Sequence, residues 1–223
     1  MRNTPMPGYQ VKTETITLAG VDWHMRCLLD TQQYADPVNT SGALGIPPAG
    51  WSLFGQVWPS ARVLALAMQT QPLTGKRVLE MGAGLALSSL VMHRRGANVT
   101  ASDWHPLTEI FLKENLLLNG LGPLKYQAGN WETDNPLLGR FDLIVGSDLL
   151  YERQQPAQLA GFIHRHAAPG AQIIIVDPDR GNRAAFGREM DALGYTLDMR
   201  AADRLLEDGV AYKGRFLTFQ RAA

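Results

Sequence analysis

A short glycine-rich segment has the composition of a turn that holds a small charged ligand. It covers residues 80–86, with the sequence EMGAGLA, after a short apolar run and before a second apolar run at 85–92. Gly82 and Gly84 allow the backbone to bend and to approach a ligand where a side chain would block it. The helix expected next points its free N–H groups at the same place. The segment therefore predicts a binding turn between a strand and a helix.

A second acid lies where a nucleoside site of the βαβ type needs one. Residues 99–103 are expected to form the next strand, which ends in Asp103, about 20 residues after the glycine turn. A carboxylate at that position accepts hydrogen bonds from ribose hydroxyls. Asp103 is therefore our candidate for binding a ribose, and Ala83 in the turn belongs to the same candidate site.

The spacing of the small residues argues against two common ligand classes. A dinucleotide-binding turn, G-x-G-x-x-G, needs its third glycine at position 87, which is Leu87 here. A phosphate-binding loop needs a Gly-Lys-Ser/Thr ending, which is absent from the segment. The order is instead E-x-G-x-G-x-A. It resembles motif I of the class I, seven-β-strand S-adenosylmethionine-dependent methyltransferases, in which an acid precedes x-G-x-G-x-G, and Ala86 departs from its last glycine by one methyl group.

This resemblance implies S-adenosylmethionine as the cofactor, and the acids around the turn agree with it. The cofactor has no phosphate and carries an ammonium, a sulfonium and a ribose diol. Glu80 would hold the turn or meet the ammonium through water, and Trp104 would stack on the adenine or wall the pocket. Asn130 and Trp131 follow the third expected strand, where the adenine edge is read in this fold.

Two further motifs resemble one branch of that family. Ser147, Asp148 and Tyr151 lie in the sequence SDLLY after the fourth expected strand, which borders the reactive methyl group in this fold. The D-x-x-Y order matches the signature of the lysine-methyltransferase-like branch, in which a tryptophan before the first helix, here Trp58 in VWPSA, contacts the cofactor. The resemblance implies that Asp148 positions the acceptor amine and could pass its proton to water. Tyr151 would stabilise the methylated cation.

The elements that must position these residues alternate regularly from residue 76 onward. Because no segment of helix length separates the last two strands, these are expected to be antiparallel neighbours. The pattern predicts an α/β fold with a doubly wound, mostly parallel seven-stranded sheet and an antiparallel last strand, the Rossmann-like methyltransferase fold. Strands are expected at 77–81, 98–102, 124–128, 141–146, 171–177, 195–200 and 215–220, and helices at 85–95, 107–118, 156–166 and 183–193.

The first 75 residues follow a different pattern. Two strands, at 9–18 and 21–29, are expected to form a β-hairpin. The segment 36–50, rich in Pro, Gly, Ser and Asn, predicts a mobile loop, and a helix is expected over 58–69. We interpret residues 1–75 as an N-terminal extension packed on a compact S-adenosylmethionine-binding methyltransferase domain over 76–223.

The composition limits the classes of binding partner and the cellular compartment that we expect for the protein. The 223 residues carry 21 basic and 21 acidic side chains, so no global field attracts nucleic acid or an anionic membrane. Cys27 is the one cysteine, which excludes an intrachain disulfide and is consistent with a reducing compartment. No apolar run approaches the ~20 residues that span a bilayer. We expect a soluble, cytoplasmic protein, without a metal because no Cys/His cluster exists.

The function predicted is the N-methylation of an acceptor by S-adenosylmethionine, with a protein lysine side chain favoured. A small amine or heteroaromatic nitrogen is an alternative acceptor, and a segment 36–50 closed as a lid would favour it. A NAD-dependent oxidoreductase is disfavoured by Leu87. A non-catalytic binding module is disfavoured by Asp148 and Tyr151. The acceptor itself, the number of methyl groups added and the oligomeric state stay open.

Overall fold

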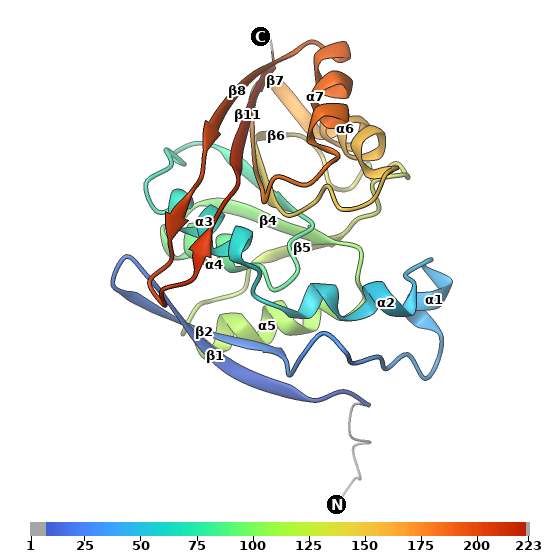
Figure 1. Cartoon of the computed structure of the whole chain (residues 1–223), viewed down its shortest axis with the longest axis vertical. Helices are drawn as coiled ribbons and strands as arrows, with labels where there is room; N and C mark the ends of the chain where they lie inside the picture. The colour runs from blue at the N-terminus through green and yellow to red at the C-terminus, as the bar shows by residue number, and fades with distance from the viewer. Residues whose placement is uncertain (1–7, 222–223) are drawn as a thin grey trace, which may run out of the picture.

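A mixed β-sheet forms the middle layer of the computed structural model, which describes residues 8–221 (Figure 1). Residues 1–7 and 222–223, placed by the sequence analysis in the extension and in the domain, lie outside the described residues. Within the described part, the sheet has seven strands in the order β5-β4-β3-β6-β7-β11-β8. The strands are β3 (Arg77–Met81), β4 (Asn98–Asp103), β5 (Lys125–Ala128), β6 (Phe141–Ser147), β7 (Ala167–Asp177), β8 (Tyr195–Ala201) and β11 (Arg215–Arg221).

The pairing of the strands confirms the predicted topology. Strands β5, β4, β3, β6 and β7 are parallel neighbours. Strand β11, the last in the chain, lies between β7 and β8 and is antiparallel to both. The order of the strands reverses between β3 and β6, so the crevice beyond the carboxyl ends of these strands is where such a sheet binds its ligand.

Helices cover both faces of the sheet, because successive side chains of each strand point to opposite faces. One core cluster contains Val78 and Ile174 together with residues of α3, α4 and α5. The other contains Leu79 and Ile175 together with residues of α6 and α7. The bounds are α3 (Pro59–Met68), α4 (Leu87–Arg94), α5 (Thr108–Leu118), α6 (Gln155–His166) and α7 (Arg183–Ala192). Each described helix is too short or too polar to cross a membrane.

The N-terminal hairpin forms as predicted, from β1 (Val11–Leu18) and β2 (Val21–Leu28). The prediction of a loop over 36–50 is wrong in part, because α1 (Thr40–Ala43) and α2 (Pro48–Trp51) form there, and a 3-10 turn, η1 (Ser52–Gly55), follows. Fully buried Trp51 anchors this segment against the rings of Tyr9 and Tyr34, a tertiary contact that local composition does not predict.

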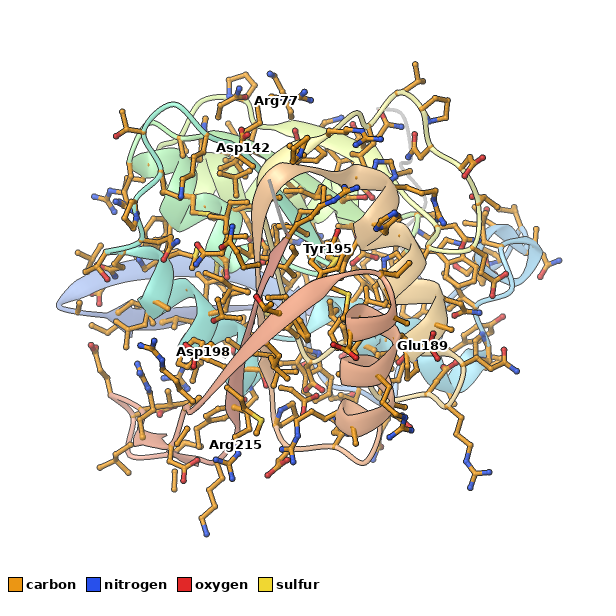
Figure 2. All side chains as sticks on the ribbon, turned by 90° about the horizontal axis from the view of Figure 1, so that it is seen from above. Arg77, Asp142, Glu189, Tyr195, Asp198 and Arg215 are labelled. Carbon is orange, nitrogen blue, oxygen red and sulfur yellow. The ribbon has the colours of Figure 1, made fainter. Side chains whose placement is uncertain are left out.

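A second small hairpin lies between β8 and β11 and was not predicted. It pairs β9 (Arg204–Leu205) with β10 (Ala211–Tyr212), strands too short to show an alternating pattern. The buried Arg62 of α3 forms an ion pair with Asp208 in its turn, at 2.6 Å between Nη1 and Oδ2. Strand β8 beside it is the edge of the sheet, and side chains such as Asp198 lie on the outside of the molecule (Figure 2).

The open edge of β2 is held by two asparagine side chains of α5 instead of another strand. Asn115 accepts the N–H of Arg26 at 2.7 Å and donates to its carbonyl at 3.4 Å. Asn119 forms the same two hydrogen bonds with the backbone of His24: it accepts the N–H at 2.9 Å and donates to the carbonyl at 2.7 Å. Four residues of a helix rise about 6 Å and two residues of a strand about 6.8 Å. Asparagines four residues apart on α5 can therefore reach residues two apart on β2.

We expect the replacement of Asn115 by leucine to lower the free energy of unfolding by about 2–4 kcal/mol. Asn115 is fully buried, so leucine would leave the N–H and C=O of Arg26 without partners away from water. The matched variant Asn119→Leu should cost less, because its site is part-exposed and water can replace the amide. Urea denaturation measures both, and equal midpoints for N115L and the wild type would contradict this account.

Candidate active site

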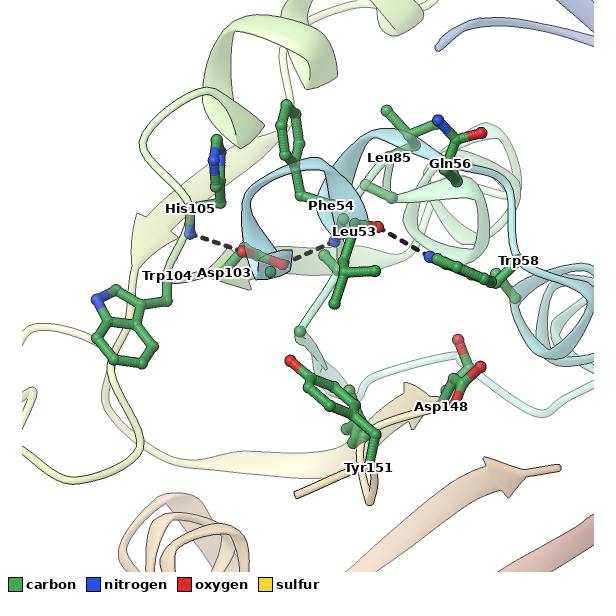
Figure 3. A pocket seen from close by; sticks show the side chains of 18 of the residues that line it. Leu53, Phe54, Gln56, Trp58, Leu85, Asp103, Trp104, His105, Asp148 and Tyr151 are labelled. Atoms are coloured by element: carbon green, nitrogen blue, oxygen red, sulfur yellow. Dashed lines mark hydrogen bonds between the residues drawn. The ribbon is translucent and has the colours of Figure 1, made fainter. Parts of the chain in front are cut away.

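A cavity of about 460 Å³ lies beyond the carboxyl ends of the parallel strands (Figure 3). Its walls come from the turn after β3 and from the residues that follow β4, β5, β6 and β7. Residues between 46 and 61, which we call the N-terminal segment, close one side. The fold thus brings together residues that lie far apart in the sequence. Ten of the predicted site residues line it, namely Trp58, Gly82, Ala83, Gly84, Asp103, Trp104, Trp131, Ser147, Asp148 and Tyr151.

Two predicted residues, Glu80 and Asn130, do not line the cavity. Buried Glu80 accepts the N–H of Ser89 at 2.6 Å, so its carboxylate holds the first turn of α4 behind the glycine turn. Burial raises the pKa of Glu80 to about 7. Asn130 accepts the N–H of Glu132 at 2.8 Å and shapes its own loop. A contact of either side chain with a cofactor stays a prediction.

The glycine turn has a backbone that only small residues adopt easily. Gly82 has a φ of 56° and Gly84 a φ of 51°, both left-handed. A Cβ on Gly82 would lie 2.5 Å from Leu149, and one on Gly84 would lie 3.0 Å from the carbonyl oxygen of Phe54. Ala86 has a φ of 60°, which explains why the family pattern has glycine there and why α4 begins two residues later than predicted.

Asp103 fixes the glycine turn from the end of the neighbouring strand. Its Oδ2 accepts the N–H of Gly84 at 2.8 Å, and its Oδ1 accepts the N–H of His105 at 2.8 Å (Figure 3). A carboxylate oxygen has two lone pairs, so each oxygen can still accept a hydrogen bond from a ligand. Asp103 therefore offers a fixed pair of acceptors at the cavity wall, as the position after the second strand predicted.

An aromatic cluster that the sequence did not predict joins the N-terminal segment to the loop after β4. The imidazole of His105 stacks on the ring of Phe54, with centroids 3.8 Å apart and an interplanar angle of 10°. Trp51 meets the imidazole edge-on at 5.5 Å. The indole N–H of Trp58 donates to the carbonyl of Leu53 at 2.8 Å. The only sequence signal for His105 was its place directly after Asp103 and Trp104.

Stability should depend on pH through His105. Burial lowers its pKa to about 4, so the unfolded chain, with a pKa near 6.5, binds the proton more readily. The stability contributed by neutral His105 is full above about pH 6.5 and is lost as the pH falls toward 4. Between pH 7 and pH 5 the loss is about 2 kcal/mol.

The test compares the wild type with His105→Asn at both pH values, because two raised carboxyl groups act in the opposite direction. Burial raises the pKa of Glu80 to about 7 and that of Asp177 to about 6. The wild type and the variant both keep these two groups, so their effect cancels in the comparison. Asparagine keeps an acceptor for the N–H of Leu107, which His105 Nδ1 accepts at 3.2 Å. Equal losses of unfolding free energy on acidification in the two proteins would refute the assignment.

Asp148 forms an ion pair with Arg180, a residue that the sequence analysis did not single out. Arg180 Nε lies 2.7 Å from Oδ1 of Asp148, and Nη2 lies 3.1 Å from Oδ2. Asp148 has a φ of 55° and donates its N–H to the carbonyl of Val176 at 2.9 Å. Both side chains line the cavity, in which Asp148 lies near Tyr151 and opposite Asp103 (Figure 3). The one signal for Arg180 was its position shortly after the fifth parallel strand.

Comparisons with known proteins point to one family of enzymes. A family model described as lysine methyltransferase matches residues 49–187. Calmodulin-lysine N-methyltransferase of Arabidopsis thaliana is 29% identical over 150 residues, which cover 61% of this chain and 49% of that protein. Protein N-lysine methyltransferase METTL21A of Danio rerio is 34% identical over 128 residues, 54% of this chain and 58% of that protein. The chain thus spans about half the length of these curated relatives.

The solved structures agree on the fold. The 16S rRNA N2 G1207 methyltransferase RsmC of T. thermophilus, solved with AdoMet and guanosine, has a TM-score of 0.62 and 19% sequence identity to this chain. The match covers 98% of this chain and 52% of that one. At this identity the likeness shows a shared methyltransferase fold and no more.

Proposed function

We propose, because the chain belongs to the lysine methyltransferase family, that it transfers the methyl group of S-adenosylmethionine to the amine of a protein lysine side chain. One observation carries the proposal. The glycine turn with Asp103 and the D-x-x-Y pair, Asp148 and Tyr151, lie in the walls of a single cavity. The first group suits the nucleoside of the cofactor and the second suits an amine.

The residues of the cavity fit S-adenosylmethionine. The left-handed turn at Gly82 and Gly84 presents backbone without side chains to the cavity, and Asp103 has free lone pairs for a ribose diol. Trp104 and Trp131 offer aromatic surface for a base. Among the described lining residues, Arg180 is the one permanent cation and its charge is paired with Asp148, so a diphosphate finds no free cationic partner.

When bound, the cofactor supplies a methyl group on a sulfonium, whose leaving group is a neutral thioether. The chain has to hold the acceptor in line with that methyl group, and orientation of this kind contributes roughly 7–11 kcal/mol. Asp148 would accept an N–H of the amine, and the ring of Tyr151 would face the methylated cation. A lysine amine has a pKa of about 10.4, so presenting it uncharged at pH 7.4 costs about 4 kcal/mol.

The shape of the cavity keeps a small-molecule amine as a second candidate acceptor. Ile46 and Gly50 of the N-terminal segment line the cavity, so part of the segment 36–50 covers it. In contrast, the side chain of Arg180 is 45% exposed and Tyr151 is 46% exposed, so the end with the D-x-x-Y pair is open to solvent. An opening at this end favours a lysine that projects from a protein.

Two measurements test the proposal. Calorimetric titration with S-adenosylmethionine and with NAD should give binding of the former alone, and binding of NAD alone would end the proposal. Incubation of a cell lysate with the purified chain and cofactor labelled in the methyl group should then place the label in protein. Label confined to the small-molecule fraction would make the small amine the acceptor instead.

A further inference from the structure

The carboxylate that the acceptor needs already has a partner of fixed geometry. Two nitrogens of Arg180 face the two oxygens of Asp148, at 2.7 and 3.1 Å, which is the fork arrangement that suits a guanidinium best. The side chain of Asp148 is only 11% exposed. We propose that Arg180 neutralises Asp148 so that the acceptor site binds the uncharged amine and not the ammonium. This inference rests on the proposed function.

Arg180 is held in place by the loop that carries it. Its own N–H donates to Oδ1 of Asp177 at 3.1 Å. Two residues later, the side-chain amide of Asn182 donates to the carbonyls of Leu150 and Glu152, both at 3.0 Å. Asn182 thus joins the loop after β7 to the loop after β6 on one side of the ion pair. On the other side, the N–H of Asp148 donates to the carbonyl of Val176 at the end of β7, at 2.9 Å, so Arg180 stays at Asp148 while an acceptor binds.

The charge of the pair decides which form of an amine it accepts. A lone carboxylate favours the ammonium and raises the pKa of a nearby amine, which makes removal of the proton harder. Paired with Arg180, the Asp148 carboxylate has no net charge to offer a second cation. Each oxygen keeps a lone pair that an uncharged amine can donate to. The amine leaves its proton with bulk water, and its lone pair is free to form the N–C bond as the S–C bond breaks.

Four groups near the pair have a shifted pKa, and none of these shifts moves the group into the alkaline range where the proposal is tested. Burial raises the pKa of Asp177 to about 6 and that of Tyr212 to about 12. Burial also raises the pKa of Tyr151, and the side chain of Asp148 raises that of Arg180. The remaining charged groups that face the two loops are Asp103, Glu152, Asp179, Arg183, Asp203 and Arg215.

The test uses n-butylamine, which has the end of a lysine side chain, and the chain without cofactor. Binding is followed by tryptophan fluorescence between about pH 7.5 and 9.5, below the pKa of an alkylamine. For the wild type we expect the apparent affinity to rise about tenfold per pH unit, as the uncharged fraction of the amine rises. For Arg180→Met we expect a nearly constant affinity, because the freed carboxylate binds the ammonium. Arg180→Lys, which keeps the charge, should restore most of the slope.

Arg200→Met is the matched control, since this arginine pairs with Asp198 on the exposed edge strand β8 and its side chain is 78% exposed. It should keep the wild-type slope. A constant affinity in the wild type, a tenfold slope in R180M, or no binding of the amine by the wild type at the highest pH would each overturn the proposal. Because no cofactor is present, these outcomes are separate from the calorimetric and labelling tests of the function.

Discussion

Replacing Asp103 by asparagine should lower the affinity for S-adenosylmethionine by about 100- to 1,000-fold. Hydrogen bonds to a charged group contribute about 1.5–3 kcal/mol each, and a ribose diol would form two of them with this carboxylate. The amide also turns one acceptor into a donor that faces the N–H of either Gly84 or His105. The glycine turn should therefore loosen, and calorimetric titration measures the combined loss.

A matched substitution at the other end of the sheet controls for the change of charge. Asp142 also accepts a backbone N–H from a neighbouring strand, that of Arg77 at 2.8 Å (Figure 2). Both residues lie at the amino ends of β3 and β6, whereas the cavity lies at the carboxyl ends of these strands. Asp142→Asn should leave the affinity for the cofactor within about twofold of the wild type. If D103N binds the cofactor as tightly as D142N does, Asp103 does not hold the ribose.

The sequence predicted the parts of the site that local patterns determine. A left-handed turn needs glycine, and an acid after a parallel strand faces the crevice whatever the tertiary packing. Gly82, Gly84 and Asp103 therefore lie where they were expected. Strand β7 was equally clear, because a run of four β-branched residues is typical of a strand buried on both faces. The helices followed from the alternation of units, to within a few residues at their ends.

The parts of the site and of the fold that the sequence did not predict depend on contacts between distant segments. No local sequence pattern contains such contacts. Arg180 matters because it reaches Asp148, 32 residues away in the chain. His105 matters because Phe54 stacks on it, and the helical part of segment 36–50 depends on the burial of Trp51. The sequence analysis also placed Asn130 in the site, because this residue follows the third expected strand. In the structure its side chain turns back to its own loop.

Replacing Asp148 by asparagine should reduce kcat/KM for methyl transfer by about 100- to 1,000-fold, the usual cost of losing one preorganised group at a reacting centre. Asparagine tolerates the left-handed backbone of this residue, whereas alanine would add strain. The affinity for S-adenosylmethionine should stay within about threefold of the wild type, because Asp103 and the glycine turn are untouched. Single-turnover kinetics with labelled cofactor measures the first quantity and calorimetry the second. Unchanged turnover would remove Asp148 from the mechanism.

The double variant D148N/R180M tests why that loss should occur. In D148N the amine loses its acceptor, and the guanidinium of Arg180 also becomes an uncompensated cation that opposes the positive charge developing on the acceptor nitrogen as the N–C bond forms. Removing Arg180 as well should recover about tenfold of the lost rate, because residues that share one interaction have effects that do not add. If the two substitutions instead multiply their separate effects, the pair does not act as a unit. The rate would then depend on the carboxylate of Asp148 alone, and Arg180 would only join two loops.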